Sequence, residues 1–344
     1  MGNNEIKNVM KRTFTAAMAV AMIAVFAAET QMGASAAEAV DETESVVYAD
    51  RSESAADETV SENADETVDE TEAAELGVDG PNMIIVRRKY VSVDKVKLRG
   101  EIKYNNGETH PWGAQTNSLK IRWNAVDRVD NYEVWAYGGQ YTKWTKVKTL
   151  ASDKLAFTVK NLYRDTQYKF KVRASYSGCY GAYSDVQTLK TARIDFDKAG
   201  WEAMCRIVYH EVGGVNDKMW NEPIVHVADC IVNQYEGAKY LNDPIWAPYY
   251  KNYTSIQNII YYSGGFMSDA GLAYDGATYA NTTELVRNAV YGAVYDKIKV
   301  DNIPHDRKVF FWCNTYYYPS SYKVAYAYKI PWGGYFAIWR EYWG

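Results

Sequence analysis

Apolar residues recur every three or four positions between Trp201 and Val212, and this spacing predicts a helix with one apolar face. The residues that form the face are Trp201, Met204, Cys205, Val208 and Val212. Glu211 shares the face, because it follows Val208 by three positions. We therefore expect its carboxylate to point toward the interior, where loss of water favours the protonated form that a general acid needs.

Polar residues and glycines mark the two ends of this helix. Asp195 or Asp197 is expected to cap its start, and Gly213 with Gly214 is expected to end it in a left-handed conformation. A second interpretation is that Glu211 is only a helix-end carboxylate that pairs with a nearby lysine or arginine. The spacing alone favours neither interpretation.

The chain after residue 199 continues with further helices and then with strands. A second helix, apolar nearly all round, is predicted over 223–235, and a third over 282–296 with a capping box at 281–284. A strand over 309–313 and a closing segment rich in tyrosine and tryptophan follow. This order is typical of the α+β class.

Between residues 119 and 191 the hydrophobic period changes to two, which predicts half-buried strands of an antiparallel sandwich. The inward positions are Leu119, Ile121 and Trp123 in one strand and Tyr168, Phe170, Val172 and Ala174 in another. The fold class predicted for the whole chain is therefore multidomain, with an all-β sandwich followed by an α+β domain.

Several residues of the sandwich segment stand at positions that a known family uses. Trp123 is an early core tryptophan, and Leu162, Thr166 and Tyr168 match a leucine followed by a tyrosine corner, in which the tyrosine hydroxyl bonds to nearby backbone. In these features the segment resembles a fibronectin type III domain.

The fibronectin-like segment is expected to cover 96–193, after a basic, strand-prone lead-in at 82–95. One role for it is a spacer that holds the next domain away from its neighbours. The other role is binding of wall polymers or glycans. The spacer is favoured, because no ligand pocket is marked in the sequence.

The N-terminal part of the chain predicts export. Basic residues precede an apolar run over 14–28, and 34–36 offers a cleavage site of small residues, so 1–36 is predicted to be a signal peptide. Residues 37–81 are acidic and predicted to be a disordered linker. The mature protein is expected to be secreted or wall-associated, with no membrane span.

The part of the chain that follows the acidic linker is basic, although the net charge of the whole chain is negative. The whole chain carries a net charge of −5, of which residues 37–80 contribute −15 and the first 36 residues +1, so that +9 remains for residues 81–344. A basic exported protein favours anionic surfaces such as wall polymers or nucleic acid, and charge alone does not choose between them.

The cysteines do not have the spacing of a disulfide framework. Cys205 and Cys230 lie on predicted apolar helix faces and are expected to be core residues. A metal site is the sharper alternative, because His226 and Cys230 stand four positions apart on one helix face. The core interpretation is favoured, and no cofactor or metal is predicted.

Five blocks of the last domain, 194–344, carry a second resemblance. Tyr-His-Glu-Val-Gly-Gly ends the first helix, and four further blocks follow at 231–234, 259–266, 310–314 and 330–336. In order and spacing they resemble the cell-wall hydrolase family that includes the spore cortex-lytic enzymes. The chain departs from the family's polar residues at Gln234, at Gly265 and around Gly334.

This resemblance implies a lysozyme-like fold and cleavage of the β-1,4 bond between N-acetylmuramic acid and N-acetylglucosamine in peptidoglycan. It makes Glu211 the catalytic acid. The residues predicted to bind substrate are Asn233, Gly264, Gly265, Phe266, Asn314 and Tyr317.

The number of carboxylates separates two reactions. A lytic transglycosylase needs only Glu211, which acts first as acid and then as base, and this reaction is favoured. A hydrolase usually needs a second carboxylate, for which Asp269 and Asp275 are the nearest candidates, although both also suit ordinary turns. Five tyrosines could stack on the faces of sugar rings, or alternatively pack within the protein. They are Tyr261, Tyr262, Tyr316, Tyr317 and Tyr318.

Two other functions remain as alternatives. The first is a non-catalytic wall-binding or adhesion protein that keeps the fold, and the second, more distant, is a metal-dependent amidase. The expected partners are peptidoglycan and other anionic wall polymers, with no nucleic acid, and the protein is expected to be a monomer.

Overall fold

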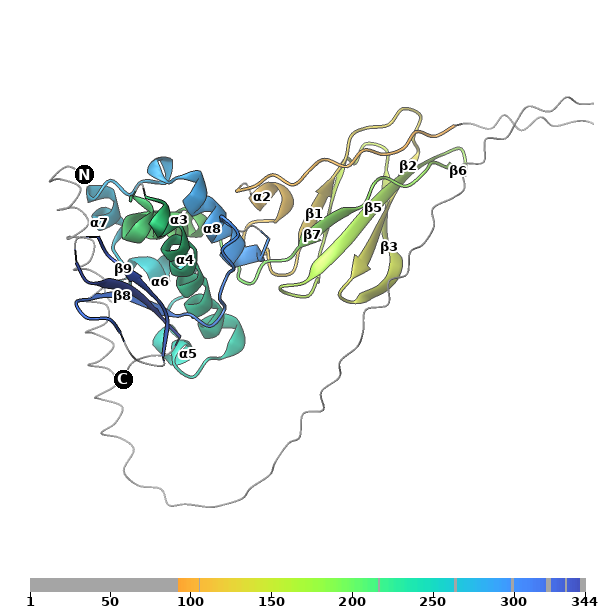
Figure 1. Cartoon of the computed structure of the whole chain (residues 1–344). Helices are drawn as coiled ribbons and strands as arrows, with labels where there is room; N and C mark the ends of the chain where they lie inside the picture. Colours follow the sequence, from red (N-terminus) through yellow and green to blue (C-terminus); the bar gives the residue numbers. More distant parts are fainter. Residues whose placement is uncertain are drawn as a thin grey trace, which may run out of the picture. The chain divides into compact units, whose positions relative to one another are not determined.

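The structure, a computed structural model, describes residues 92–104, 106–215, 217–262, 265–297, 300–319, 323–331 and 333–340. The predicted signal peptide, the acidic linker and nearly all of the basic lead-in lie outside these residues. All described residues belong to one of the two compact units into which the chain divides. Within this unit a β-sandwich comes first in the chain and a helical region follows (Figure 1).

Antiparallel strands form the sandwich in two sheets. The smaller sheet pairs β1 (Leu119–Arg122) with β4 (Ala156–Val159). The larger sheet has, in spatial order, β3 (Tyr141–Ala151), β2 (Asn131–Gly138), β5 (Gln167–Tyr176) and β6 (Cys179–Tyr180), and β7 (Gln187–Lys190) also pairs with β5. A short helix, α2 (Asn106–Thr109), precedes β1.

The core of the sandwich confirms the predicted alternation. All the predicted inward residues are buried, Trp123 among them. The hydroxyl of Tyr168 accepts a hydrogen bond from the backbone N of Tyr163 at 2.8 Å and donates one to Gln140 at 2.7 Å, so the tyrosine corner is present. Val96 is buried in the same core, which adds this early residue to the sandwich.

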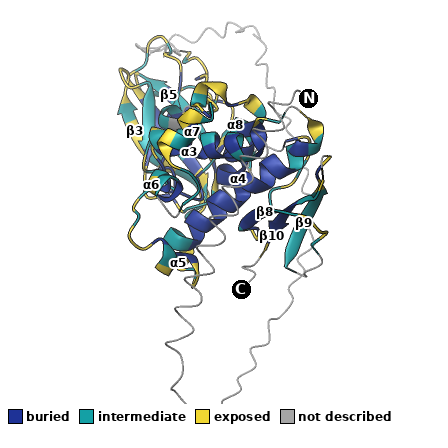
Figure 2. Cartoon of the chain, turned by 90° about the vertical axis from the view of Figure 1, so that its left-hand side faces the viewer, coloured by how far each residue is buried: buried dark blue, intermediate teal, exposed yellow. Residues whose placement is uncertain are grey.

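The helical region consists of six α-helices and short turns of 3₁₀- and π-helix among its described residues, followed by a small sheet. The α-helices are α3 (Lys198–Val208), α4 (Asn221–Glu236), α5 (Trp246–Tyr249), α6 (Ile256–Tyr261), α7 (Asp269–Tyr274) and α8 (Glu284–Tyr295). The antiparallel sheet has the order β8 (Phe311–Thr315), β10 (Tyr335–Trp339) and β9 (Val324–Lys329). Figure 2 shows α4, β8 and β10 mostly in the dark blue of buried residues.

The predicted second helix is α4, which is buried along nearly its whole length as its all-round apolar sequence implied. In the part of the chain that the structure describes, no helix is both long and apolar enough to cross a bilayer.

The predicted capping box at 281–284 is wrong. The cap of α8 is Thr283, whose side chain accepts a hydrogen bond from the backbone N of Val286 at 3.2 Å. Asn281 instead belongs to a 3₁₀ turn, Tyr279–Asn281, and donates to the carbonyl of Gly276 at 2.8 Å. Asparagine and threonine are both preferred at the N-cap position of a helix. The backbone decides between them, because Thr283 is the extended residue immediately before the helix.

Candidate active site

Glu211 lies in a turn of π-helix that continues α3. The helix is capped by Asp197, whose side chain accepts a hydrogen bond from the backbone N of Gly200 at 2.7 Å, so of the two predicted caps, Asp195 and Asp197, the second is the one used. Over Tyr209–Gly213 the helix widens to the π form, and Gly214 N bonds to the Tyr209 carbonyl at 3.0 Å. Such turns are frequent at functional sites, because the extra residue changes where neighbouring side chains point.

The glycine pair does not end the helix in the predicted left-handed conformation. Gly214 has φ −83° and ψ −1°, in the right-handed region. The reason for glycine at position 213 is close packing, since a Cβ atom there would lie 2.4 Å from Cγ2 of Val286 on α8. Glycine is therefore needed at position 213 for packing against α8, a segment far away in the sequence, and not for a left-handed turn.

Trp312 on β8 binds the carboxylate of Glu211. Its indole Nε1 donates a hydrogen bond to Oε2 of Glu211 at 3.2 Å. The ring of Phe266 stacks on the Trp312 ring with centroids 5.4 Å apart and an interplanar angle of 2°. Trp312 is buried and Glu211 half-buried, so the partly covered carboxylate is bound by a tryptophan whose ring stacks on Phe266.

Asn314 lies on the same face of β8 as Trp312, because side chains two residues apart in a strand point the same way. Its Oδ1 atom is buried and has no hydrogen-bond partner among the described residues. A buried acceptor without a partner costs about 1–3 kcal/mol, which a ligand donor would recover. Trp312 itself was not predicted as a site residue. Its position two residues before the predicted site residue Asn314 in the same strand could have indicated it, because such residues share a face.

Of the two predicted loop glycines, Gly264 lies outside the described residues. At Gly265 a Cβ atom would lie 2.3 Å from the carbonyl oxygen of Ile259 and 2.9 Å from that of Ile260. The backbone around position 265 therefore leaves no space for a side chain. Phe266, the next residue, is the one whose ring reaches Trp312.

Asn233 lies in the interior of the helical region and is 2% exposed. Its Nδ2 donates to the carbonyls of Asp306 at 3.0 Å and Val309 at 2.7 Å, and its Oδ1 accepts from Nη2 of Arg193 at 2.6 Å. Arg193 is itself buried and pairs with Glu236. These contacts connect Asn233 to the core of the domain, and none of them joins it to Glu211.

The two predicted second carboxylates both have basic partners. Asp269 pairs with Nη1 of Arg206 at 2.5 Å. Asp275 lies 3.6 Å from Nδ1 of His210, which is buried and directly precedes Glu211 in the sequence.

The tyrosines predicted to stack on sugars fall into two groups. Tyr262 packs against Tyr253 with ring centroids 4.5 Å apart, and the hydroxyl of Tyr261 binds Arg206 at 2.9 Å, so these two lie within the fold. The turn after β8 is open to solvent, with Tyr316, Tyr317 and Tyr318 exposed at 93%, 87% and 64%. Tyr317 thus follows Trp312 and Asn314 in sequence on an exposed rim.

The cysteines and histidines do not assemble a metal site in the described part of the chain, where no cluster of three ligand residues occurs. Cys205 and Cys230 are fully buried, and burial raises the pKa of both thiols well above the usual value. His226 stacks on Tyr326 with centroids 3.9 Å apart, and its Nδ1 lies 3.0 Å from the hydroxyl of Tyr328.

Comparison with known proteins identifies the sandwich. The sequence pattern of the fibronectin type III family matches residues 109–189. These residues form a fibronectin type III domain. The match covers the sandwich alone, within the span of 96–193 expected from the sequence.

Solved structures similar to the chain also contain such domains. They include the FN1–FN3 domains of chicken CNTN1, with 20% identity, coverage of 22% of this chain and 26% of that chain, and a TM-score of 0.21. They also include an Fn3-like protein from Clostridium thermocellum, with 20% identity, coverage of 23% and 80%, and a TM-score of 0.21. The chain spans about a quarter of the CNTN1 structure. No curated protein matches this chain.

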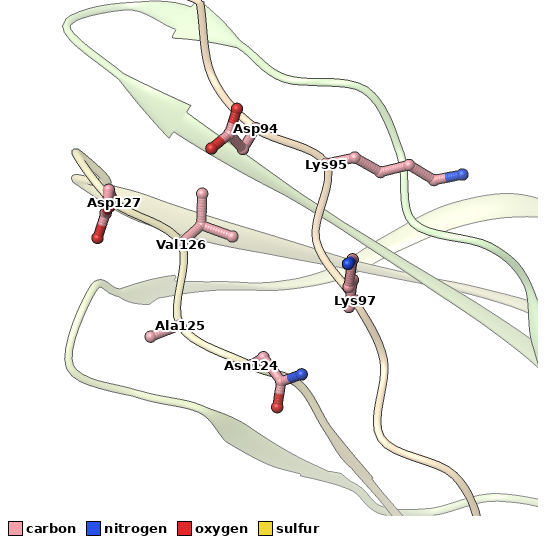
Figure 3. Close-up of a pocket in the computed structure, with 7 residues that line it drawn as sticks. All are labelled: Asp94, Lys95, Lys97, Asn124, Ala125, Val126 and Asp127. Atoms are coloured by element: carbon pink, nitrogen blue, oxygen red, sulfur yellow. The ribbon is translucent and has the colours of Figure 1, made fainter.

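A shallow depression of about 500 Å³ lies between residues 94–97 and residues 124–127 of the fibronectin type III domain (Figure 3). Its lining residues are Asp94, Lys95, Lys97, Asn124, Ala125, Val126 and Asp127. The side chain of Lys95 points away from the other lining residues and pairs with Asp185 at 2.7 Å. None of the residues predicted to bind substrate lines this depression.

Proposed function

We propose that this protein is an exported enzyme that cleaves the β-1,4 bond between N-acetylmuramic acid and N-acetylglucosamine, with Glu211 as general acid and base. The observation that carries the proposal is the carboxylate of Glu211, held by the indole N–H of Trp312 beside the ring of Phe266. In this proposal the helical region is lysozyme-like, and the sugar chain lies along Glu211, Asn314 and the tyrosines after β8.

The proposed reaction needs a single carboxylate that carries a proton at the start. Glu211 donates this proton to the glycosidic oxygen as the bond to C1 breaks and positive charge develops on the sugar. The carboxylate then removes the proton of the C6 hydroxyl, whose oxygen attacks C1. The products are a 1,6-anhydro sugar and a new hydroxyl end, no water is consumed, and Glu211 is again protonated.

The surroundings of Glu211 support this role in two ways. The hydrogen bond from Trp312 fixes one carboxylate oxygen, so the orientation of the acid is set before substrate binds. The half-buried ring of Phe266, stacked on Trp312, is also suited to the apolar C–H face of a pyranose ring.

The ion pair of Asp269 favours the transglycosylase over a hydrolase that uses Asp269. In a hydrolase the second carboxylate lies about 5–9.5 Å from the acid and activates water or attacks the sugar. Asp269 is held by Arg206 at 2.5 Å and already balances its positive charge. Asp275 lies 3.6 Å from Nδ1 of His210, which carries a charge only when protonated. Asp275 is the better hydrolase candidate, because its partner is the sequence neighbour of Glu211.

A specific observation also favours the second function, a non-catalytic wall-binding protein. No side chain fits at Gly265, so the polar group that the resembling family carries there is missing, and a fibronectin type III domain accompanies the helical region. Such a protein would hold glycan strands without cleaving them.

The masses of the soluble products distinguish these functions. The purified protein is incubated with peptidoglycan in parallel with and without a strong metal chelator, and the soluble products of both incubations are analysed. Anhydro ends, lighter by one water, are the expected result. Reducing ends would replace the transglycosylase by a hydrolase, and wall binding without any product would favour the non-catalytic protein. Activity that needs metal would contradict both enzyme mechanisms and support the amidase.

A further inference from the structure

The outward face of the larger sheet in the fibronectin type III domain interleaves aromatic and cationic side chains. We call it the aromatic–basic face, and its residues are Trp135, Tyr137, Trp144, Lys146, Lys169, Lys171, Arg173, Tyr180 and Tyr183. The alternate residues of β2 and β5 point inward and form the buried core. Figure 1 shows β3, β2 and β5 side by side, and Figure 2 shows β3 in the teal and yellow of half-buried and exposed residues.

The strand register places cations opposite aromatic rings. Trp135 on β2 is paired with Lys171 on β5 and with Lys146 on β3, and Tyr137 is paired with Lys169. Residues directly opposite each other in antiparallel strands share a face and lie close together. The face is therefore a regular array that follows from the alternation of the three strands.

The side chains of the array touch one another over several rows. Nζ of Lys171 lies 4.4 Å from the ring centre of Trp144 and 3.9 Å from that of Tyr183. Cζ of Arg173 lies 4.0 Å from the ring centre of Tyr180. Cation–π contacts of this kind hold the charged groups in place over the rings.

The face has an excess of positive charge. Glu133 lies on the same face of β2, where its neighbours bury it, and accepts hydrogen bonds from Arg173 at 2.8 Å and Lys146 at 2.9 Å, which anchors these two cations. Among the described residues, neither Lys169 nor Lys171 makes an ion pair. Partial burial and, to a lesser extent, the charge of Arg173 lower the pKa of Lys171. A nearby anion would therefore stabilise the charged form of Lys171.

The rings are open to a ligand as well as to the cations. Tyr137 is 40% exposed and Tyr180 is 56% exposed, and Lys146 keeps 46% of its side chain exposed. A small anion would use the charges and leave the rings unused, whereas a neutral sugar would leave the charges unused. A chain of sugar rings that carries negative groups uses both kinds of side chain.

We propose that the aromatic–basic face binds an anionic polysaccharide, with sugar rings stacked on Tyr137 and Tyr180 and negative groups paired with Lys169 and Lys171. This gives the fibronectin type III domain a binding role in place of the spacer favoured from the sequence. The role is independent of whether Glu211 is catalytic.

Binding of defined chains to the purified full-length protein tests the chemistry. Polygalacturonate is the probe, its fully methyl-esterified form keeps the rings without the charge, and poly-glutamate keeps the charge without the rings. Binding of polygalacturonate that weakens with added salt, and much weaker binding of both comparison chains, is the expected result. Equal binding of poly-glutamate, or tighter binding of a single-stranded DNA oligonucleotide, would overturn the proposal.

Variants locate the binding on the face. Lys169→Gln with Lys171→Gln keeps most of each side chain and is expected to weaken polygalacturonate binding about tenfold, as the loss of two charge contacts implies. Tyr180→Ala removes an exposed ring, and a loss of about fivefold is expected. The matched control is Lys120→Gln with Lys160→Gln, on β1 and directly after β4 in the other sheet. Unchanged binding by both face variants, or equal loss in the control, would refute the assignment.

Discussion

Replacing Asn233 by alanine is expected to destabilise the helical region and to leave sugar binding by the folded protein unchanged. The change removes three hydrogen bonds in the interior, at 2.6 Å from Arg193 and at 3.0 and 2.7 Å to the carbonyls of Asp306 and Val309. A neutral hydrogen bond contributes about 1 kcal/mol net and one to a charged group about 1.5–3 kcal/mol, so the free energy of unfolding should fall by about 3–5 kcal/mol.

Urea unfolding followed by far-ultraviolet circular dichroism measures this loss. The helical signal reports on the helical region, because the fibronectin type III domain is built from strands. With a urea dependence of about 2 kcal/mol per molar, the midpoint should fall by about 2 M. The matched control is Asn258→Ala on α6, an exposed position where a change within about 0.5 kcal/mol is expected.

A different outcome would refute this reasoning. If the Asn233→Ala protein unfolds at the wild-type midpoint but binds peptidoglycan more weakly, Asn233 contacts the substrate, as the sequence resemblance implied. The three interior hydrogen bonds of Asn233 would then contribute little to the stability of the helical region.

Three further predictions concern stability. Burial alone would raise the pKa of Glu101, but His110 and Lys297 lower it to about 2, so the stability from this group is present above pH 4.5 and lost as the pH falls toward 2. In the Glu101→Gln protein, the loss of unfolding free energy between pH 4.5 and pH 2 should be smaller than in the wild type by about 2–3 kcal/mol. An unchanged loss would contradict the lowered pKa of Glu101. Gly265→Ala should lower the melting temperature, corresponding to about 1–3 kcal/mol, because its Cβ meets the Ile259 carbonyl at 2.3 Å, and an unchanged melting temperature would show that the loop adapts. Tyr168→Phe should cost the sandwich about 1–2 kcal/mol in chemical denaturation through loss of the bonds to Tyr163 and Gln140, whereas no loss would mean that the corner is not stabilising.

The sandwich could be predicted from sequence because its signals are local. A strict period of two places Tyr168 and its alternate neighbours in the core, and the tyrosine corner spans only a few residues, from Tyr163 to Tyr168. The apolar faces of α3 and α4 follow from helical spacing in the same way.

The surroundings of Glu211 could be predicted only in part, because they depend on contacts between distant segments. The helix and its apolar stripe were predicted, but the π turn was not, and the close approach of Val286 to Gly213 has no local signal. Trp312 lies 101 residues from Glu211, and only the folded chain places its indole N–H on the carboxylate. The predicted left-handed stop failed for the same reason, since packing against α8 selects glycine there.

The measurement that tests the central claim most directly is the rate at which a Glu211→Gln protein releases soluble muropeptides from peptidoglycan. Glutamine keeps the size of the side chain, and its amide oxygen still accepts from Trp312, so the fold and wall binding should be retained. The rate should fall by about 10²–10⁴-fold, the usual contribution of a general acid. Glu202→Gln, which lies on the same helix and faces Lys198 at 3.8 Å, is the control and should keep the wild-type rate. Release at the wild-type rate by the Glu211→Gln protein would contradict the account.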